Sequence, residues 1–487
     1  MNERESLNRY LESYGLGGSV RFHMPGHKGR RTLYDIHGFG SLTREPFAMD
    51  ITEIPGADNL QQPRGVLRRI MDGYAAQYGA EHTELLVNGS TAGLLAAVLA
   101  AVPRGGKLIL GRDAHRAVHG ALRLGAVQPV YAEPAFDSAG GLALPVTPES
   151  IEHQLYQHPD ASAVLITSPN YYGILADVER IARVCHVFHK PLIVDQAHGA
   201  HLIYFDALAE REGREERRAA EHLGADLVVN STHKTLLSLT GTGILNICSE
   251  RVPAEEVAAK LRLVQTTSPS YLAMASLDAN ERITAASGLE IAARWEEDVR
   301  RFYEKAKGIL GLEILGRPDL DRTKINVSLR KLGLTGAELE QELWRHHIIS
   351  ELSYGDFVLF MTGAGNERSD YEHALEALQE ISWAHAGENR TRAPKQHGRQ
   401  EAPKYLGMKL EQPLEQEEIP TSYEELPLYL AEGRVLYDAL IPYPPGAPIA
   451  CPGEVISREL IDTVLWLLDE DRSVIGVDEE RCIKVGK

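Results

Sequence analysis

Short apolar segments alternate with amphipathic helical segments between residues 64 and 265, and this alternation constrains the fold more than any other feature. The apolar segments are Leu85–Val87, Lys107–Leu110, Ala163–Ile166, Leu192–Val194 and Leu227–Val229. Each is too short for a helix, and helical patterns near 91–101 and 177–189 lie between them. Strands that alternate with helices predict an α/β fold, with a mostly parallel sheet covered on both faces.

Polar clusters follow several of these strands, at the end where parallel sheets bind ligands. Lys234 stands in Ser-Thr-His-Lys directly after the strand 227–229, and Asp195 ends the strand 192–194. A lysine and a carboxylate at neighbouring strand ends are suited to the aldehyde carbon and the ring nitrogen of pyridoxal 5'-phosphate. The alternative for Lys234 is a solvated lysine at the start of a helix.

A second cluster, Asn88–Gly93, lies between a strand and a helix. Small residues at a helix N-terminus let backbone amides face an anion, and Ser90 and Thr91 add hydroxyl donors. Ser231 and His233, beside Lys234, fit the same cofactor phosphate. A plain helix cap is the alternative for Ser90 and Thr91, since both residue types are favoured there anyway.

Three histidines lie near these strand ends. His198 can hydrogen-bond and orient Asp195, and His115 can stack on a cofactor ring. A metal pair formed by His198 and His201 is an alternative, but no HExxH motif or matching carboxylate set accompanies them, so no metal is expected. A purely structural role for these histidines, and a surface-loop position for His115, are also open.

Composition narrows the function classes. The formal charge of −18 argues against nucleic acid as a partner, because phosphate binding needs clustered Lys and Arg in excess. No apolar run of about 18 residues exists, so no membrane span is expected. The 4 cysteines are far apart in the sequence, which favours a reducing cytoplasm over a disulfide framework.

A chain of 487 residues is too long for one core, and several domains are expected. Residues 275–384 continue with a charged helix near 290–308, a strand at 325–329 and a helix near 336–346. The predicted units are an N-terminal segment (1–60), a large cofactor domain (61–274), a small α/β domain (275–384), a polar linker (385–418) and a C-terminal α+β domain (419–487).

The chain resembles the ornithine/lysine/arginine decarboxylase family, which are pyridoxal-phosphate enzymes of fold type I, the aspartate aminotransferase fold. The resemblance covers nearly the whole length and looks like the short type, without an additional N-terminal domain. It is carried by the Asp195 and Lys234 motifs together with Phe22–Gly29, Asp50–Ile54, Ser168–Gly173 and Tyr443–Glu454.

The resemblance implies a role for each site residue. Lys234 would bind the cofactor aldehyde covalently, Asp195 would contact the ring nitrogen and His115 would stack on the ring. His198 would support Asp195, and Glu454 is a tentative contact for the cationic end of the substrate. The cofactor phosphate would be held by Ser90, Thr91, Ser231 and His233.

The resemblance also implies shared active sites in a homodimer or higher homo-oligomer, because Thr267–Tyr271 resembles a segment that reaches a partner's cofactor. Two positions depart from the family pattern. Gln196 stands where Glu is usual, and Gly241 where Gln is frequent. Neither is one of the implied cofactor contacts, so we expect the cofactor site to survive.

The implied reaction is decarboxylation of arginine, lysine or ornithine to an amine of polyamine biosynthesis. The sequence does not decide among the three substrates. An aminotransferase on the same fold is the first rival, in which Arg317 or Arg322 would hold the substrate α-carboxylate. The second rival is a cofactor-binding relative without catalytic activity.

Overall fold

The computed structural model describes residues 6–137, 142–388, 414–443, 448–469 and 472–487. Its central sheet has the strand order β2-β10-β9-β8-β7-β3-β4. These strands are β2 (His82–Leu86), β3 (Lys107–Gly111), β4 (Gln128–Ala132), β7 (Ala161–Thr167), β8 (Leu192–Asp195), β9 (Leu227–Asn230) and β10 (Gly243–Ile247). Neighbours from β9 to β4 are parallel, whereas β10 is antiparallel to both β2 and β9. The predicted mostly parallel α/β fold is confirmed.

Helices cover both faces of this sheet because its strands are apolar on both faces. Leu108 and Leu110 pack with α6 (Gly89–Ala101), α7 (Arg116–Gly125) and α12 (Ala254–Val264). The intervening Ile109 packs on the opposite face, against α8 (Pro148–Gln157) and α9 (Val178–Val187). Successive strand side chains point to opposite faces, so one strand serves two cores.

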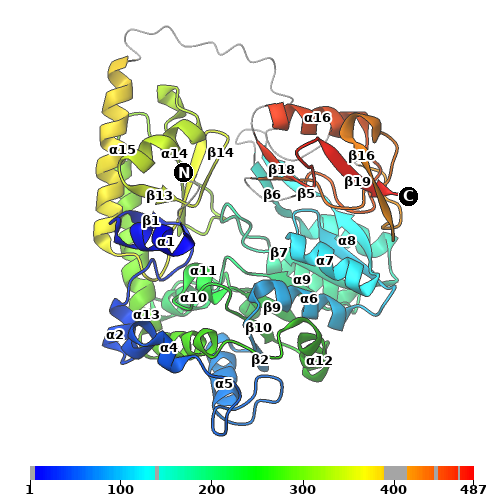
Figure 1. Ribbon diagram of the computed structural model, residues 1–487, viewed down its shortest axis with the longest axis horizontal. Coiled ribbons are helices and arrows are strands. Elements are labelled where there is room, and N and C mark those ends of the chain that lie inside the picture. Colours follow the sequence, from blue (N-terminus) through cyan, green and yellow to red (C-terminus); the bar gives the residue numbers. More distant parts are fainter. Residues whose placement is uncertain (1–5, 138–141, 389–413, 444–447, 470–471) are drawn as a thin grey trace.

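A smaller antiparallel sheet has the order β11-β12-β15-β14. Its elements and the helices beside it are β11 (Glu313–Ile314), β12 (Lys324–Ser328), β14 (Leu352–Tyr354), β15 (Phe357–Met361), α14 (Gly336–Arg345) and α15 (Arg368–Glu388). The N-terminal strand β1 (Val20–Phe22) pairs in parallel with β13 (Ile348–Ser350). The N-terminal segment therefore packs with the small sheet, and Figure 1 shows both on the same side of the molecule.

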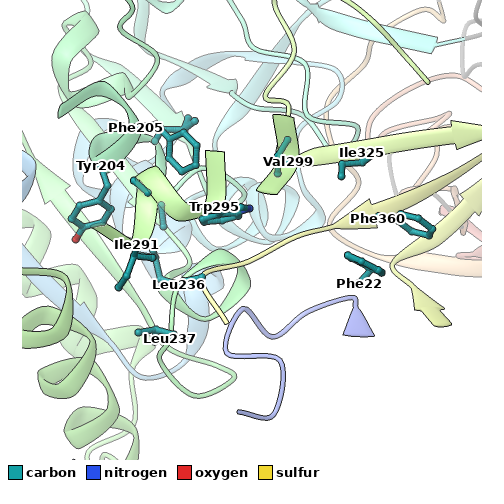
Figure 2. Close-up of a cluster of buried hydrophobic side chains, with 14 of the residues drawn as sticks. Phe22, Tyr204, Phe205, Leu236, Leu237, Ile291, Trp295, Val299, Ile325 and Phe360 are labelled. Atoms are coloured by element: carbon teal, nitrogen blue, oxygen red, sulfur yellow. The ribbon is translucent and has the colours of Figure 1, made fainter. Parts of the chain in front are cut away.

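A shared apolar core joins the small sheet to the large one (Figure 2). Phe22 of β1 stacks on Phe360 of β15, with 4.7 Å between the ring centroids. Trp295 packs edge-on against Phe205 and donates a 2.7 Å hydrogen bond to Thr362. Aromatic pairs of this kind add stability beyond the area that they bury.

Trp295 belongs to α13 (Tyr271–Ala306), which has non-helical backbone angles at Ser287. The boundary predicted between residues 274 and 275 lies inside this helix. The division into domains stays a proposal. Most of the predicted linker (389–413) and the residues 444–447 of the terminal motif lie outside the described residues.

The C-terminal elements form two antiparallel two-stranded sheets, β16 with β19 and β17 with β18, and one helix; they are β16 (Tyr423–Pro427), β17 (Ile441–Tyr443), α16 (Arg458–Asp469), β18 (Ser473–Ile475) and β19 (Cys482–Gly486). Figure 1 shows them beside α7 and α8, away from α15. Arg123 of α7 anchors this contact through an ion pair of 3.1 Å with Asp438. The guanidinium of Arg123 also lies 3.7 Å from the ring centroid of Tyr437.

The remaining elements are short or peripheral: α1 (Leu7–Leu16), α2 (Thr32–Ile36), α3 (Gly40–Arg44), α4 (Pro46–Met49), α5 (Val66–Tyr78), β5 (Pro134–Asp137), β6 (Leu142–Val146), α10 (Leu202–Arg211) and α11 (Thr232–Thr235), with 3-10 turns at Ala220–Leu223, Arg330–Leu332 and Leu428–Leu430. Among the described residues, no helix combines the length and apolarity that crossing a membrane requires.

All four cysteines carry free thiols.

Candidate active site

A pocket with about 720 Å³ of empty space opens at the carboxyl ends of the parallel strands. Its lining residues are Ser90, Asp113, His115, Ala143, Thr167, Pro169, Asn170, Tyr171, Tyr172, Asp195, Ala197, His198 and Lys234. Five of the residues predicted from the sequence are among them, contributed by four different strand ends. The fold therefore gathers residues that are far apart in the chain.

Lys234 lies in the short helix α11 that follows β9. The N-terminal loop packs directly on this turn, where Gly26 donates a 2.8 Å hydrogen bond to the carbonyl of His233. A Cβ at Gly26 would lie 2.2 Å from the carbonyl oxygen of Leu236, so only glycine permits this approach. Burial lowers the pKa of Lys234, and the nearby Asp195 partly opposes that shift.

Asp195 ends β8 and is 4% exposed. One of its carboxylate oxygens accepts a 3.1 Å hydrogen bond from the backbone N–H of Ala197. His198 lies in the following turn, and its ring centroid is 4.8 Å from that of Tyr171. No hydrogen bond joins His198 to Asp195 in the described part of the chain. Burial, together with the charge of Lys234, lowers the pKa of His198 well below its usual value.

Of the four predicted phosphate ligands, Ser90 alone is among the residues that line the pocket. Ser231 is fully buried with a hydroxyl that has no hydrogen-bond partner. His233 donates from Nδ1 to the carbonyl of Thr242 at 2.6 Å, and burial lowers its pKa to about 4. Thr91 is exposed and does not line the pocket of the single chain.

His115 caps the N-terminus of α7, because its Nδ1 accepts a hydrogen bond of 3.2 Å from Ala117 N–H. The cap fixes the imidazole at the end of β3, where it lines the pocket. A flat ring in this place is suited to stacking on a planar ligand.

Four buried polar atoms of this region have no hydrogen-bond partner: Oδ1 of Asp113, Oγ1 of Thr167, Nδ1 of His198 and Oγ of Ser231. Leaving such an atom unpaired costs about 1–3 kcal/mol. Such atoms fit a polar ligand that arrives with its own donors and acceptors. Together with the amine of Lys234 and the carboxylate of Asp195, they fit an aldehyde-bearing pyridine phosphate.

Several lining residues were missed by sequence reasoning. Asp113 lies two positions before His115, and Thr167 ends β7, so position at a strand end was a usable signal for both. Tyr171 donates a 2.8 Å hydrogen bond to Glu351 of the small-sheet region. The Tyr171–Glu351 contact had no local sequence signal, since the partners are 180 residues apart.

The two departures from the family pattern have structural explanations. Gln196 points away from the pocket and donates to the half-buried Glu221 (2.9 Å) and to Asn230 (3.1 Å). Gly241 has φ +88°, and its carbonyl accepts a 2.7 Å hydrogen bond from Gly89 at the start of α6. Neither side chain lines the pocket.

Glu454 does not line the pocket of the single chain. Its carboxylate pairs with Arg112 at two positions, one of them 2.8 Å from Nη2, and accepts a 2.7 Å hydrogen bond from Cys451 N–H. The tentative substrate contact of Glu454 stays a prediction. Arg317, which is paired with Asp319 at 2.8 Å, does not line the pocket either.

A second buried polar group lies directly behind the pocket. Lys324 of β12 donates to the backbone carbonyl of His198 and to Asp321, both at 2.6 Å. Asp321 also lies 3.1 Å from His201. His201 therefore faces Asp321 while His198 faces the pocket, and no metal-binding group of three or more His, Cys, Asp or Glu occurs in the described chain.

Comparison with known proteins places this geometry in a family. Residues 6–309 match the model of the Orn/Lys/Arg decarboxylase major domain, and residues 406–479 match that of its C-terminal domain. An arginine decarboxylase of Bacillus subtilis is 31% identical over 98% of this chain and 97% of its own length. The constitutive lysine decarboxylase of Escherichia coli is 21% identical over 97% of this chain and 79% of its own.

Solved structures agree on the fold. The crystal structure of the Francisella novicida lysine decarboxylase superposes with a TM-score of 0.77 at 17% identity, covering 100% of this chain and 79% of that one. The fold is that of the fold type I pyridoxal-phosphate enzymes. This protein belongs to the Orn/Lys/Arg decarboxylase family and is a decarboxylase.

Proposed function

We propose that this protein removes carbon dioxide from a basic amino acid, with pyridoxal 5'-phosphate bound in the pocket of Lys234 and Asp195. The observation that carries the proposal is the placement of that amine and that carboxylate in one pocket whose walls hold unpaired polar atoms. Packing alone does not favour such an arrangement, because each buried unpaired group costs free energy.

Each wall of the pocket supplies one part of the cofactor site. Ser90 and Ser231 would hold the phosphate with His233 and Thr91 beside them, and His115 would cover one face of the ring. Bound pyridoxal phosphate supplies an electron sink for the pair of electrons released when the carboxylate leaves. The polar atoms of pyridoxal phosphate would then pair with buried side-chain atoms that have no hydrogen-bond partner within the chain.

The charged residues of the pocket act on protons. The carboxylate of Asp195, which lines the pocket, would hold a proton on a ring nitrogen placed against it. Burial lowers the pKa of Lys234 and favours the free amine that attacks an aldehyde. His198, with a depressed pKa, supports this region as a neutral imidazole.

We propose arginine as the first substrate, with lysine and ornithine as the alternatives. Support comes from the relatives, because the arginine decarboxylases of Bacillus subtilis and Bacillus anthracis are 31% and 29% identical to this chain. The lysine decarboxylases of Hafnia alvei and Escherichia coli are 21% identical. Measuring released carbon dioxide and the amine product for each amino acid decides the substrate, and a preference for lysine or ornithine contradicts this order.

The aminotransferase rival is less well supported by the geometry. It needs an arginine for the substrate α-carboxylate, and neither Arg317 nor Arg322 lines the pocket. Arg322 instead lies 4.3 Å from the ring centroid of Tyr303. Formation of a keto acid without release of carbon dioxide would favour this rival.

We propose that the active form is a cytoplasmic homodimer or higher homo-oligomer. The segment Thr267–Tyr271 is mostly exposed, and the backbone N–H of Thr266, just before it, donates a 3.1 Å hydrogen bond to Asn88 Oδ1 at the phosphate end of the site. An exposed segment so close to the pocket is suited to a neighbouring subunit. Sedimentation of the purified protein tests the assembly, and an active monomer would contradict it.

The cofactor assignment is tested by mass. Borohydride treatment of the native protein with pyridoxal phosphate, followed by digestion, should leave a pyridoxyl group on the peptide that contains Lys234. A label on another lysine, or no label, would overturn the proposed cofactor site. Lys28 provides the internal comparison, because it is buried and its amine donates to the carbonyls of His23 and Met361 at 2.6 and 2.9 Å.

A further inference from the structure

Asp113 is a second carboxyl of the pocket, with no part in the cofactor contacts proposed for the other lining residues. It lines the pocket at the end of β3, and its Oδ1 is buried without a hydrogen-bond partner. A Cβ added to Gly111 would lie 2.5 Å from that Oδ1. The carboxyl of Asp113 therefore folds back over the strand end into space that only a glycine leaves free.

The second carboxyl shares its surroundings with Asp195. Burial raises the pKa of Asp113 to about 7, and the negative charge of Asp195 adds to the effect. Two carboxyl groups that line the same pocket do not both ionise cheaply. Asp195, at the end of β8, accepts a hydrogen bond from the backbone N–H of Ala197. A backbone hydrogen bond also opposes the rise in the pKa of Asp113, but its Oδ1 has no partner.

The positive charge nearest to Asp113 in the sequence does not offset this repulsion. The guanidinium of the preceding Arg112 is committed to Glu454. Besides the two carboxyl groups, the titratable groups that line the pocket are His115 in the same loop, His198 after β8, Lys234 after β9, and the phenols of Tyr171 and Tyr172.

We propose that Asp113 is a positioning residue of the cofactor pocket, a neutral carboxylic acid that donates a hydrogen bond to the bound group and leaves the negative charge to Asp195. This inference rests on the proposed function, since it assumes that the pocket takes pyridoxal phosphate. That group carries a phosphate, and a second anionic carboxylate in the pocket would repel it. A neutral acid offers a donor without that repulsion.

The test measures the affinity of the apo-protein for pyridoxal phosphate as a function of pH, in the wild type and in Asp113→Asn. The variant keeps the size and the hydrogen-bonding capacity of the side chain but does not ionise. We expect wild-type affinity, relative to the variant, to fall about tenfold as the pH rises through about 7, the order expected for one added charge several ångströms away. Taking the ratio at each pH cancels the titration of the phosphate and of Lys234.

Glu84 supplies a matched control. Burial also raises its pKa to about 7, but it lies on β2 and does not line the pocket. Glu84→Gln should keep the wild-type dependence of cofactor affinity on pH. The proposal is overturned if Glu84→Gln loses the fall in cofactor affinity near pH 7. It is also overturned if Asp113→Asn shows the same fall as the wild type.

Two further measurements separate the parts of the proposal. Asp113→Leu removes the donor as well as the charge, so its affinity should be lower than that of Asp113→Asn at every pH; equal affinities overturn the hydrogen bond. Glu84→Gln leaves Asp113 in place, so its infrared spectrum should keep a protonated-carboxyl band below pH about 7. Absence of that band would show that Asp113 is not a neutral acid. A wild type that binds no pyridoxal phosphate at any pH contradicts the proposed function instead.

Discussion

Lys324 and Lys234 lie on opposite sides of the turn that carries His198, and their surroundings differ completely. Lys324 is 0% exposed and is bonded to the carboxylate of Asp321 and to the His198 carbonyl. Lys234 has no hydrogen bond from its amine within the described residues and faces a pocket. Burial lowers the pKa of both lysines. Lys324 is fully buried and paired, whereas Lys234 is only partly buried and unpaired, as its proposed reactive role requires.

The same contrast extends to the polar groups around each lysine. Asp321 and His201 pair with each other at 3.1 Å behind the pocket. On the pocket side, Thr167 and Ser231 keep unpaired hydroxyl oxygens. A satisfied network stabilises the fold and orients its neighbours, whereas unpaired groups are kept where a ligand will pair with them.

Lys234→Ala should give the largest functional effect, a complete loss of turnover, because Lys234 contributes the only amine among the residues that line the pocket. Its stability should hardly change, by less than about 1 kcal/mol, since no hydrogen bond of that amine is lost. Assays of released carbon dioxide and urea unfolding provide the two measurements. Measurable turnover in a folded Lys234→Ala protein would refute the assigned role.

Lys324→Met should show the opposite pattern, a loss of about 3–5 kcal/mol in the free energy of unfolding, because the buried Asp321 is left without its cation. The double variant Asp321→Asn/Lys324→Met should recover much of that loss, since neither charge then remains. Urea unfolding of the three proteins measures both effects. Wild-type stability in the single variant would show that the pair is not structural.

Glu454→Gln separates a structural role from a substrate contact. If the pairing with Arg112 is its main role, the free energy of unfolding should fall by about 2 kcal/mol, the value of a hydrogen bond to a charged group, with KM nearly unchanged. Unfolding and substrate saturation are measured on the same preparation. A KM increase of more than about tenfold at unchanged stability would instead favour the contact with the substrate's cationic end.

Sequence reasoning predicted those features that follow from local patterns. The strands ending at Asp195 and preceding Lys234 are present as β8 and β9, because continuous apolar runs fit strands buried on both faces. Residues placed at the carboxyl ends of such strands necessarily converge, so Ser90 and His115 also reached the pocket.

Features that depend on pairing across the chain were not predictable. The antiparallel insertion of β10 between β2 and β9 is such a feature, and so is the pairing of β1 with β13. The partner of Glu454 was missed because Arg112 lies 342 residues away. Asp113 was passed over because a single carboxyl in a loop has no signature until burial and the neighbouring Asp195 are known.

Glu84 is a partly buried acid on β2 that belongs to neither of these polar groups, so it tests the comparison from outside both. Burial raises its pKa from 4.5 to about 7, so between these values the folded protein holds a proton that the unfolded chain releases. The contribution of Glu84 is therefore fully present below pH 4.5 and is lost as the pH rises through about 7. Glu84→Gln should remove this dependence and gain about 2 kcal/mol over the wild type at pH about 8, with little gain at pH about 4. Urea unfolding at both pH values measures the difference; an equal gain at both would mean that the fold does not raise the pKa of Glu84.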